Sequence, residues 1–213
     1  MPSRQPIFRR HPGLRGVSFS AAAGELIALR GPNGAGKSTL LRILAGALRP
    51  NAGEVRIAGA AAGAAEARRL TGFLSHQSLL HPILTVRENL EFYATLFALP
   101  DRAAAAQRAL ELVRGAWLAP RRVDELSQGM KQKAALARCL LHTPRLLLLD
   151  EPFASLDRVT VAEMRTTLAE MRDRGMTLIV SSHQEEAFAG LAVRSLELER
   201  GRLLEAPSLQ VQS

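Results

Sequence analysis

The sequence lacks cysteine pairs, lysine clusters and long apolar runs, and each absence narrows the possible functions. Cys139 is the single cysteine among 213 residues, so an internal disulfide is excluded and a reducing compartment is favoured. A membrane helix needs about 18 consecutive apolar residues, whereas the strongest run, LLLL at 146–149, ends in Asp150. Pro12 and nearby glycines interrupt the basic N-terminal stretch, so we expect no secretion signal and a protein that stays where it is made.

The charge of the chain is positive but dispersed. The formal net charge of +8 permits an acidic partner, such as nucleic acid or an anionic membrane surface. Basic residues never occur in runs longer than two, and only positions 37, 131 and 133 are lysine. We therefore attribute the charge to a general preference for arginine, and expect no nucleic-acid partner. The 47% hydrophobic content predicts a globular domain, with a surface loop at the alanine- and glycine-rich residues 58–65.

A phosphate-binding pattern lies near the N-terminus. The stretch GPNGAGKST fits G-x-x-x-x-G-K-[ST] and stands between residues 25–30, expected to form a strand, and residues 37–48, expected to form a helix. In that arrangement, backbone N–H groups and the helix N-terminus surround a phosphate. Lys37 is expected to reach the β- and γ-phosphates, and the Ser38 hydroxyl to bind Mg²⁺. The predicted nucleotide-binding residues are Gly31, Pro32, Asn33, Gly34, Ala35, Gly36, Lys37, Ser38 and Thr39.

Two carboxylates follow the apolar run at 146–149. Four consecutive leucines favour a strand buried on both faces, as in a parallel sheet, where ligands bind at the carboxyl ends of the strands. Asp150 is therefore predicted to hold Mg²⁺, directly or through water. Glu151, one residue further, is placed to act as general base on an attacking water. A pair of acidic residues at the start of a helix is the alternative interpretation.

Two further strands are expected to end in polar side chains. Residues 177–183 lead to His183, which is expected to donate a hydrogen bond to the γ-phosphate. Residues 72–77 lead to Gln77, which is expected to position the water or complete the Mg²⁺ shell. Each residue alone indicates little, whereas their occurrence together with the phosphate-binding pattern indicates a nucleotide-hydrolysing site.

Six motifs follow one another along the chain: GPNGAGKST, called here the P-loop, then Gln77, LSQGM at 126–130, LLLLDE at 146–151, SLD at 155–157 and His183. Their order resembles that of the ATP-binding subunit of ABC transporters, over residues 8–205. The resemblance implies an α/β P-loop NTPase with a mixed, mainly parallel core sheet, an N-terminal antiparallel β region and an inserted helical subdomain. It implies one domain over 1–213, with a core at 1–77 and 142–213 and a helical subdomain at about 78–141. ATP and Mg²⁺ are the implied ligands, and ATP hydrolysis is the implied activity.

The LSQGM stretch, called here the signature stretch, is a second phosphate-binding element. The resemblance implies a head-to-tail homodimer in which each ATP lies between the P-loop of one subunit and the signature stretch of the other. Ser127 is predicted to cap a helix at 127–141 and, with Gly129, to contact the γ-phosphate; Gln128 and Asp157 belong to the same nucleotide site. The family's usual stretch is Leu-Ser-Gly-Gly-Gln, so Gln128 and Met130 are departures. Phe8 takes the place of the family's adenine-stacking aromatic residue.

The region between Gln77 and the signature stretch is predicted to be helical. Residues 85–88 form a T-x-x-E capping box, followed by helices at 86–99 and 101–117. One apolar stripe of the first helix comprises Val86, Leu90, Tyr93 and Phe97. The resemblance implies that a groove in this region receives a short helix of the membrane partner.

We hypothesise that this groove is lined by residues directly after Gln77. They are Leu79, Leu80 and His81, together with exposed residues of 86–97. The hypothesis rests on the apolar character of the segment that follows the expected γ-phosphate-sensing glutamine.

The signature stretch also suggests a transport direction. A signature ending in Gly-Met resembles that of exporter ATPases with separate membrane chains, and residues 72–97 and 150–157 most resemble the haem exporter ATPase of cytochrome c biogenesis. We therefore expect an ATPase at the cytoplasmic face of the cell membrane that powers export through separate permease subunits. An exporter of drugs, polysaccharide or lipid stays open, as does a non-transport ABC ATPase acting on nucleic acid or ribosomes. The signature stretch argues against a nucleotide kinase.

Overall fold

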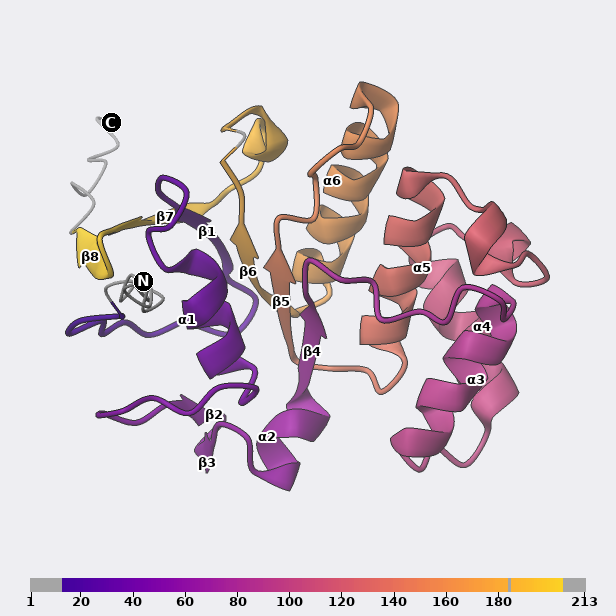
Figure 1. Ribbon diagram of the computed structural model, residues 1–213, viewed down its shortest axis with the longest axis horizontal. Helices are drawn as coiled ribbons and strands as arrows, with labels where there is room; N and C mark the ends of the chain where they lie inside the picture. The colour runs from indigo at the N-terminus through magenta and orange to yellow at the C-terminus, as the bar shows by residue number, and fades with distance from the viewer. Residues whose placement is uncertain (1–12, 184, 205–213) are drawn as a thin grey trace, which may run out of the picture.

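The structure is a computed structural model that describes residues 13–183 and 185–204, and it contains one large sheet flanked by helices (Figure 1). The elements are, in chain order, β1 (Leu26–Arg30), α1 (Lys37–Leu44), β2 (Arg56–Ile57), β3 (Ala60–Ala61), α2 (Ala65–Leu70), β4 (Thr71–Leu74), α3 (Val86–Leu96), α4 (Arg102–Leu112), η1 (Ala116–Leu118), η2 (Val123–Glu125), α5 (Gln128–Leu140), β5 (Leu146–Asp150), α6 (Arg158–Asp173), β6 (Thr177–Ser181), η3 (Glu185–Phe188), β7 (Arg194–Glu199) and β8 (Arg202–Leu204).

The large sheet has the strand order β4-β5-β6-β1-β7-β8. Its neighbouring strands from β4 to β7 pair in parallel, and β8 pairs antiparallel to β7. The predicted mixed, mainly parallel sheet is therefore confirmed. The other antiparallel pair is β2–β3, so the surface loop predicted at residues 58–65 is interrupted by the short strand β3 and reaches the first residue of α2. Strands of only two residues are too short to show an alternating pattern in the sequence.

The core lies on both faces of the sheet. In β1, Leu26 and Ala28 belong to one buried cluster and Ile27 and Leu29 to the other, because successive side chains of a strand point to opposite faces. Strand β5 divides its leucines in the same way, which confirms the prediction of a strand buried on both faces. Helix α1 packs on one face, whereas α5 and α6 contribute to the cluster on the other.

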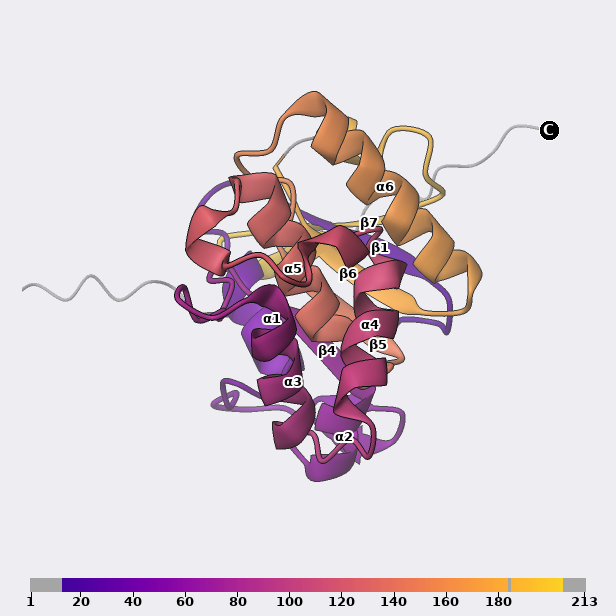
Figure 2. The same cartoon turned by 90° about the vertical axis from the view of Figure 1, so that its right-hand side faces the viewer.

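Helices α3, α4 and α5 lie together beside the β4 edge of the sheet (Figures 1 and 2). The predicted capping box of α3 is present, since Thr85 accepts from the Glu88 N–H and Glu88 accepts from the Thr85 N–H. The helix ends at Leu96, three residues earlier than predicted, because Ala98 takes a left-handed conformation (φ 53°). The N–H groups of Ala98 and Leu99 then bond back to the last turn, which closes the helix.

The other helix ends also differ from the predictions. Helix α4 stops at Leu112 because Arg114 is left-handed (φ 54°), and a separate 3₁₀ turn follows where the helix was predicted to continue. An arginine is rare at a left-handed helix end, so this residue did not predict the end of the helix. Helix α1 ends at Leu44, whereas the helix was predicted to continue to residue 48. The left-handed Gly46 (φ 68°), two residues later, could have predicted this end. In the described ranges, no helix combines the length and apolarity that crossing a bilayer requires.

Candidate functional site

Three parallel strands bring the motifs together at one edge of the sheet. β1 leads into the glycine loop, while β5 and β6 end beside each other at Asp150 and Ser181, which are register partners. Gly31 begins the loop with φ 132°, and a side-chain Cβ there would lie 2.0 Å from the carbonyl oxygen of Leu198. Only glycine allows this close approach of the loop to β7.

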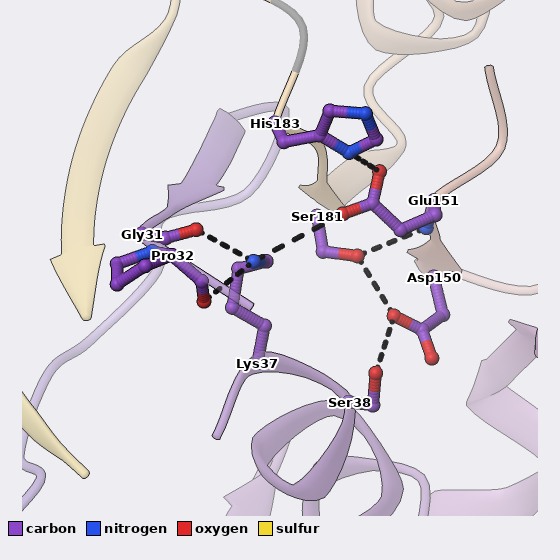
Figure 3. A network of polar contacts seen from close by, with 8 residues as sticks. All are labelled: Gly31, Pro32, Lys37, Ser38, Asp150, Glu151, Ser181 and His183. Atoms are coloured by element: carbon purple, nitrogen blue, oxygen red, sulfur yellow. Dashed lines mark hydrogen bonds and ion pairs between the residues drawn. The ribbon is translucent and has the colours of Figure 1, made fainter. Parts of the chain in front are cut away.

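Lys37, the first residue of α1, is buried within the glycine loop (Figure 3). Its Nζ donates to the carbonyl oxygens of Gly31 at 2.7 Å and Pro32 at 3.3 Å, and lies 4.0 Å from Oε1 of Glu151. The Lys37 ammonium has three hydrogen-bond donors. It is therefore positioned to contact a phosphate that lies between the loop and Glu151. The structure thus brings the predicted lysine and the predicted general base to the same place.

Asp150 joins the P-loop helix to β6 through two hydroxyl groups (Figure 3). Ser38 Oγ donates to Asp150 Oδ1 at 3.0 Å, and Ser181 Oγ donates to the same oxygen at 2.8 Å. Asp150 is 4% exposed and Ser181 is fully buried. Mg²⁺ prefers hard oxygen ligands such as a hydroxyl and a carboxylate, so Ser38 and Asp150, two of the three predicted metal-binding residues, fit the ion.

Glu151 has a strained backbone that aims its side chain into the site. Its φ is 51°, which is uncommon outside glycine, and its N–H donates to Ser181 Oγ at 2.9 Å and to the Ser181 carbonyl oxygen at 3.2 Å. Oε2 of the Glu151 carboxylate is hydrogen-bonded to His183 Nδ1 at 3.0 Å. Strained residues concentrate at functional sites, and here the strain separates the directions of Asp150 and Glu151.

Ser181 contacts both predicted carboxylate residues, Asp150 and Glu151, but it was not predicted as a site residue. Strand β6 was predicted to extend to His183, but it ends at Ser181. The serine lies in an apolar strand, and no pattern in the sequence indicates its bonds to residues about thirty positions earlier. A polar residue inside an otherwise apolar buried strand was the one available signal.

Gln77, which was predicted to act beside the metal, does not join this network. Strand β4 ends at Leu74, the register partner of Leu149, so Gln77 lies in the loop that leaves the same edge of the sheet. The strand predicted at 72–77 is thus too long, because Ser75 Oγ bonds to the Gln77 carbonyl oxygen and turns the chain. The Gln77 side chain is exposed and is not among the contacts of Figure 3. Phe8 lies outside the described residues.

The signature stretch begins α5, as predicted. Ser127 is the N-cap and accepts from the Met130 N–H at 3.3 Å, while the Met130 sulfur accepts from the Ser127 N–H at 3.4 Å. Methionine therefore supplies the returning bond of a capping box with a weak acceptor. At Gly129, a Cβ would lie 3.0 Å from the Thr160 methyl group, so glycine permits the close packing of α5 against α6.

Asp157 and Cys139 have structural roles. Asp157 caps α6, and its pKa is lowered because it accepts hydrogen bonds from the backbone N–H and the hydroxyl of Thr160. Cys139 is buried, as predicted, and burial raises the pKa of its thiol.

Leu80, which was hypothesised to line a docking groove, is only 8% exposed and belongs to the core, so that part of the hypothesis is wrong.

Comparison with known proteins reveals extensive similarity. A family model described as ABC transporter matches residues 14–154. The chain is 39% identical over 201 residues to an Fe(3+) ions import ATP-binding protein of Rhodococcus jostii (strain RHA1), covering 90% of this chain and 57% of that protein. It is 36% identical over 207 residues to the sulfate/thiosulfate import ATP-binding protein of Salmonella typhi, covering 93% and 57%. The chain therefore spans little more than half the length of these curated relatives.

Solved structures agree with the observed fold. The dimeric structure of MJ0796, a bacterial ABC transporter cassette, superposes with a TM-score of 0.80 at 29% identity, covering 89% of this chain and 88% of that one. A second dimeric structure of the same cassette, in a post-hydrolysis state bound to ADP and Pi, has a TM-score of 0.79. The predicted fold class is thereby confirmed.

The predicted haem exporter is wrong. The relatives reported above are import ATP-binding proteins for Fe(3+) and for sulfate or thiosulfate, so the similarity favours import over export and over cytochrome c biogenesis. The Gly-Met ending of the signature stretch misled the prediction. In this structure Met130 serves to cap α5, which is a local function that carries no information on transport direction.

Proposed function

This chain belongs to the ATP-binding family of ABC transporters, and from that premise we propose that it is the ATP-hydrolysing subunit of an ABC importer. The observation that carries the proposal is the 36–39% identity to import ATP-binding proteins over at least 90% of the chain. Such a subunit works at the cytoplasmic face of the membrane, bound to separate membrane-spanning subunits. The relatives named above import Fe(3+) or sulfate and thiosulfate, so a small inorganic ion is the proposed class of cargo.

ATP and Mg²⁺ are the proposed ligands of the glycine loop and its neighbours. Residues 31–39 surround the phosphates with backbone N–H groups at the start of α1, and Lys37 supplies positive charge to the β- and γ-phosphates. Ser38 and Asp150 are proposed to hold Mg²⁺, with Gln77 completing its shell. The ion's contribution is to neutralise charge on the phosphate oxygens.

Glu151 is proposed as the general base. Its carboxylate is 20% exposed and held by His183, so it can take the proton of a water that attacks the γ-phosphorus. His183 orients this carboxylate and donates to the γ-phosphate, while Lys37 stabilises the negative charge on the transferred group. The left-handed backbone of Glu151 directs the base away from Asp150, so the two carboxylates serve different tasks.

A head-to-tail dimer is proposed to complete each site. Ser127 and Gln128 are exposed at the N-terminus of α5, and α5 lies apart from α1 in Figure 1. The signature stretch is thus available to the nucleotide of a second subunit, with Asp157 nearby at the start of α6. The dimeric structures of the related cassette support this arrangement.

Exposed apolar side chains on and before α3 are proposed to receive the membrane subunit. We define this docking surface as Leu79, Ile83, Phe92 and Leu96, which are 51%, 61%, 55% and 65% exposed. Phe92 and Leu96 share one face of α3, and Tyr93 bonds to the Leu79 carbonyl oxygen, so the loop is held against the helix. Exposed large apolar residues in one region indicate an interaction site.

The first test uses Glu151→Gln, which keeps the shape of the base and removes its charge. ATP binding should persist, while turnover should fall by about 10²–10⁴-fold. Lys37→Ala is the matched control and should weaken nucleotide binding itself. Near-normal turnover of the Glu151→Gln variant would contradict the proposed role of Glu151.

The second test identifies the partner and the cargo. The tagged Glu151→Gln variant, trapped with ATP, is purified from detergent-solubilised membranes of its host, and the co-purified proteins are identified by mass spectrometry. Membrane subunits together with reduced cellular uptake of radiolabelled sulfate or Fe(3+) are expected. Co-purification of ribosomes or nucleic acid without a membrane protein would refute the transport role.

The docking surface has its own test. Leu96→Asp should lower membrane association because a charge replaces an apolar contact, whereas Trp117→Asp should not, since Trp117 is similarly exposed on a different element, η1. The measurement is the fraction of the chain in the membrane pellet. Equal association of both variants with the membrane would contradict the proposed surface.

A further inference from the structure

Arg138 is a buried cation whose bonds converge on the loop that carries Gln77. It lies near the end of α5 and is only 8% exposed. Its Nη2 donates to the carbonyl oxygen of Phe73 and its Nε to that of Ser78, both at 3.2 Å. These two carbonyls stand on either side of Gln77, so one guanidinium fixes the beginning and the end of the loop.

Tyr93 extends this arrangement to α3. The Arg138 guanidinium carbon lies 5.1 Å from the centre of the Tyr93 ring, which is within the range of a cation–π contact. The Tyr93 hydroxyl donates to the Leu79 carbonyl oxygen at 2.6 Å. Leu79 is one residue past the second bond of Arg138 and is itself strained, with φ 56°.

The burial of this charge requires an explanation. Burying an arginine costs free energy unless its donors are satisfied, and in the described part of the chain its polar contacts are all to uncharged groups: two carbonyls, the Cys139 sulfur and the Tyr93 ring. An apolar residue would fill the same space at lower cost. The buried arginine instead holds the loop, because its planar fork reaches the carbonyls of Phe73 and Ser78 at once.

The position of Arg138 on α5 connects the loop to the signature stretch. Eleven residues separate Ser127 from Arg138, about three helical turns, so both lie on nearly the same face of α5, about 16 Å apart along its axis. A rigid helix moves its two ends together. Any displacement of the signature stretch is therefore transmitted to the carbonyls on both sides of Gln77.

We propose that Arg138 is a positioning residue for Gln77, and that Tyr93 couples it to the docking surface. The inference rests on the proposed function, in which Gln77 acts at the nucleotide. Arg138 and Tyr93 touch neither ATP nor Mg²⁺; they set the path of residues 73–79 between the docking surface and the catalytic edge of the sheet.

The test is a double-mutant cycle measured by steady-state ATP hydrolysis of the purified chain. Arg138→Lys keeps the charge but removes the planar fork whose separate Nε and Nη2 atoms bond the two carbonyls, and Tyr93→Phe keeps the ring but loses the bond to Leu79. We expect kcat to fall about tenfold in Arg138→Lys and about threefold in Tyr93→Phe, with KM for ATP within about twofold of the wild type. Arg108→Lys, on the exposed side of α4, is the matched control and should change neither parameter.

Repeating the substitutions in a Gln77→Ala background distinguishes an effect that acts through Gln77 from a general loss of activity. If both residues act through Gln77, neither substitution lowers kcat further once the glutamine side chain is gone. Amide hydrogen exchange supplies a second readout: Arg138→Lys should accelerate exchange in residues 74–80 and leave α1 unchanged. Tyr93→Phe keeps the test decisive if Arg138→Lys does not fold.

Three results would each overturn the inference. The first is a kcat loss in the Gln77→Ala background equal to that in the wild type, and the second is unchanged exchange in residues 74–80. The third is a Gln77→Ala variant with normal kcat. Failure of the proposed function is distinguishable, because then Lys37→Ala would have no effect on ATP binding.

Discussion

Replacing Ser181 by alanine tests the least expected part of the site. The hydroxyl is fully buried and donates to Asp150 Oδ1 at 2.8 Å, while it accepts from the Glu151 N–H at 2.9 Å. In Ser181→Ala the Glu151 N–H retains the Ser181 carbonyl oxygen at 3.2 Å, so the main loss is one hydrogen bond to a buried carboxylate. Such a bond contributes about 2 kcal/mol to the free energy of unfolding.

Two measurements follow from this loss. For a chain of this length, about 2 kcal/mol corresponds to a decrease in Tm of about 4–8 °C, measured by circular dichroism. The Asp150 carboxylate would also be held by Ser38 alone, so it can rotate out of the position in which it is proposed to hold Mg²⁺. We therefore expect kcat for ATP hydrolysis to fall by about tenfold.

The matched control is Ser195→Ala, which changes a partly buried serine of β7 in the same sheet. It should leave Tm within about 2 °C of the wild type, because substitutions away from buried polar networks usually change stability little. A Ser181→Ala variant with unchanged Tm and unchanged kcat would refute the argument that this hydroxyl orients Asp150. A lower Tm with normal kcat would limit the serine to a structural role.

Three further outcomes are expected. Ser127→Ala removes the α5 cap, so Tm should fall by about 2–4 °C, corresponding to about 1 kcal/mol, and ATP-dependent dimerisation measured by gel filtration should weaken. Gly31→Ala places a Cβ against the Leu198 carbonyl, so ATP binding should be lost; normal binding by calorimetry would contradict the packing argument. Burial lowers the pKa of His142, so the unfolded chain takes up its proton first as pH falls below about 6.5 and stability decreases; His142→Gln should show a smaller loss of Tm between pH 7.5 and 5.5.

Much of the nucleotide site could be predicted from local sequence. The P-loop lysine and serine lie in one continuous stretch, and the leucine run ends directly at Asp150 and Glu151. Because parallel strands present their carboxyl ends at one edge, these separate motifs were expected to meet, and the Ser38–Asp150 bond shows that they do. The capping residues Thr85 and Ser127 were also predictable, since a cap acts within four residues.

Other features depend on contacts between distant segments. Helices α3 and α4 end where an alanine and an arginine turn left-handed, and neither residue type signals a stop. The direction of transport was wrongly predicted, because the prediction relied on the Gly-Met ending of the signature stretch, and in this structure Met130 takes part in capping α5.

Short stretches with fixed spacing identify the candidates for binding phosphate, metal and water, because each of these chemistries needs particular residue types at particular distances along the chain. Which other residues hold these candidates in place follows from the tertiary structure. Ser181 reaches Asp150 because β5 and β6 pair in register, and Arg138 reaches the Gln77 loop because α5 packs against the end of β4. Such contacts arise from the pairing of strands and the packing of helices many residues apart, and no local pattern encodes them.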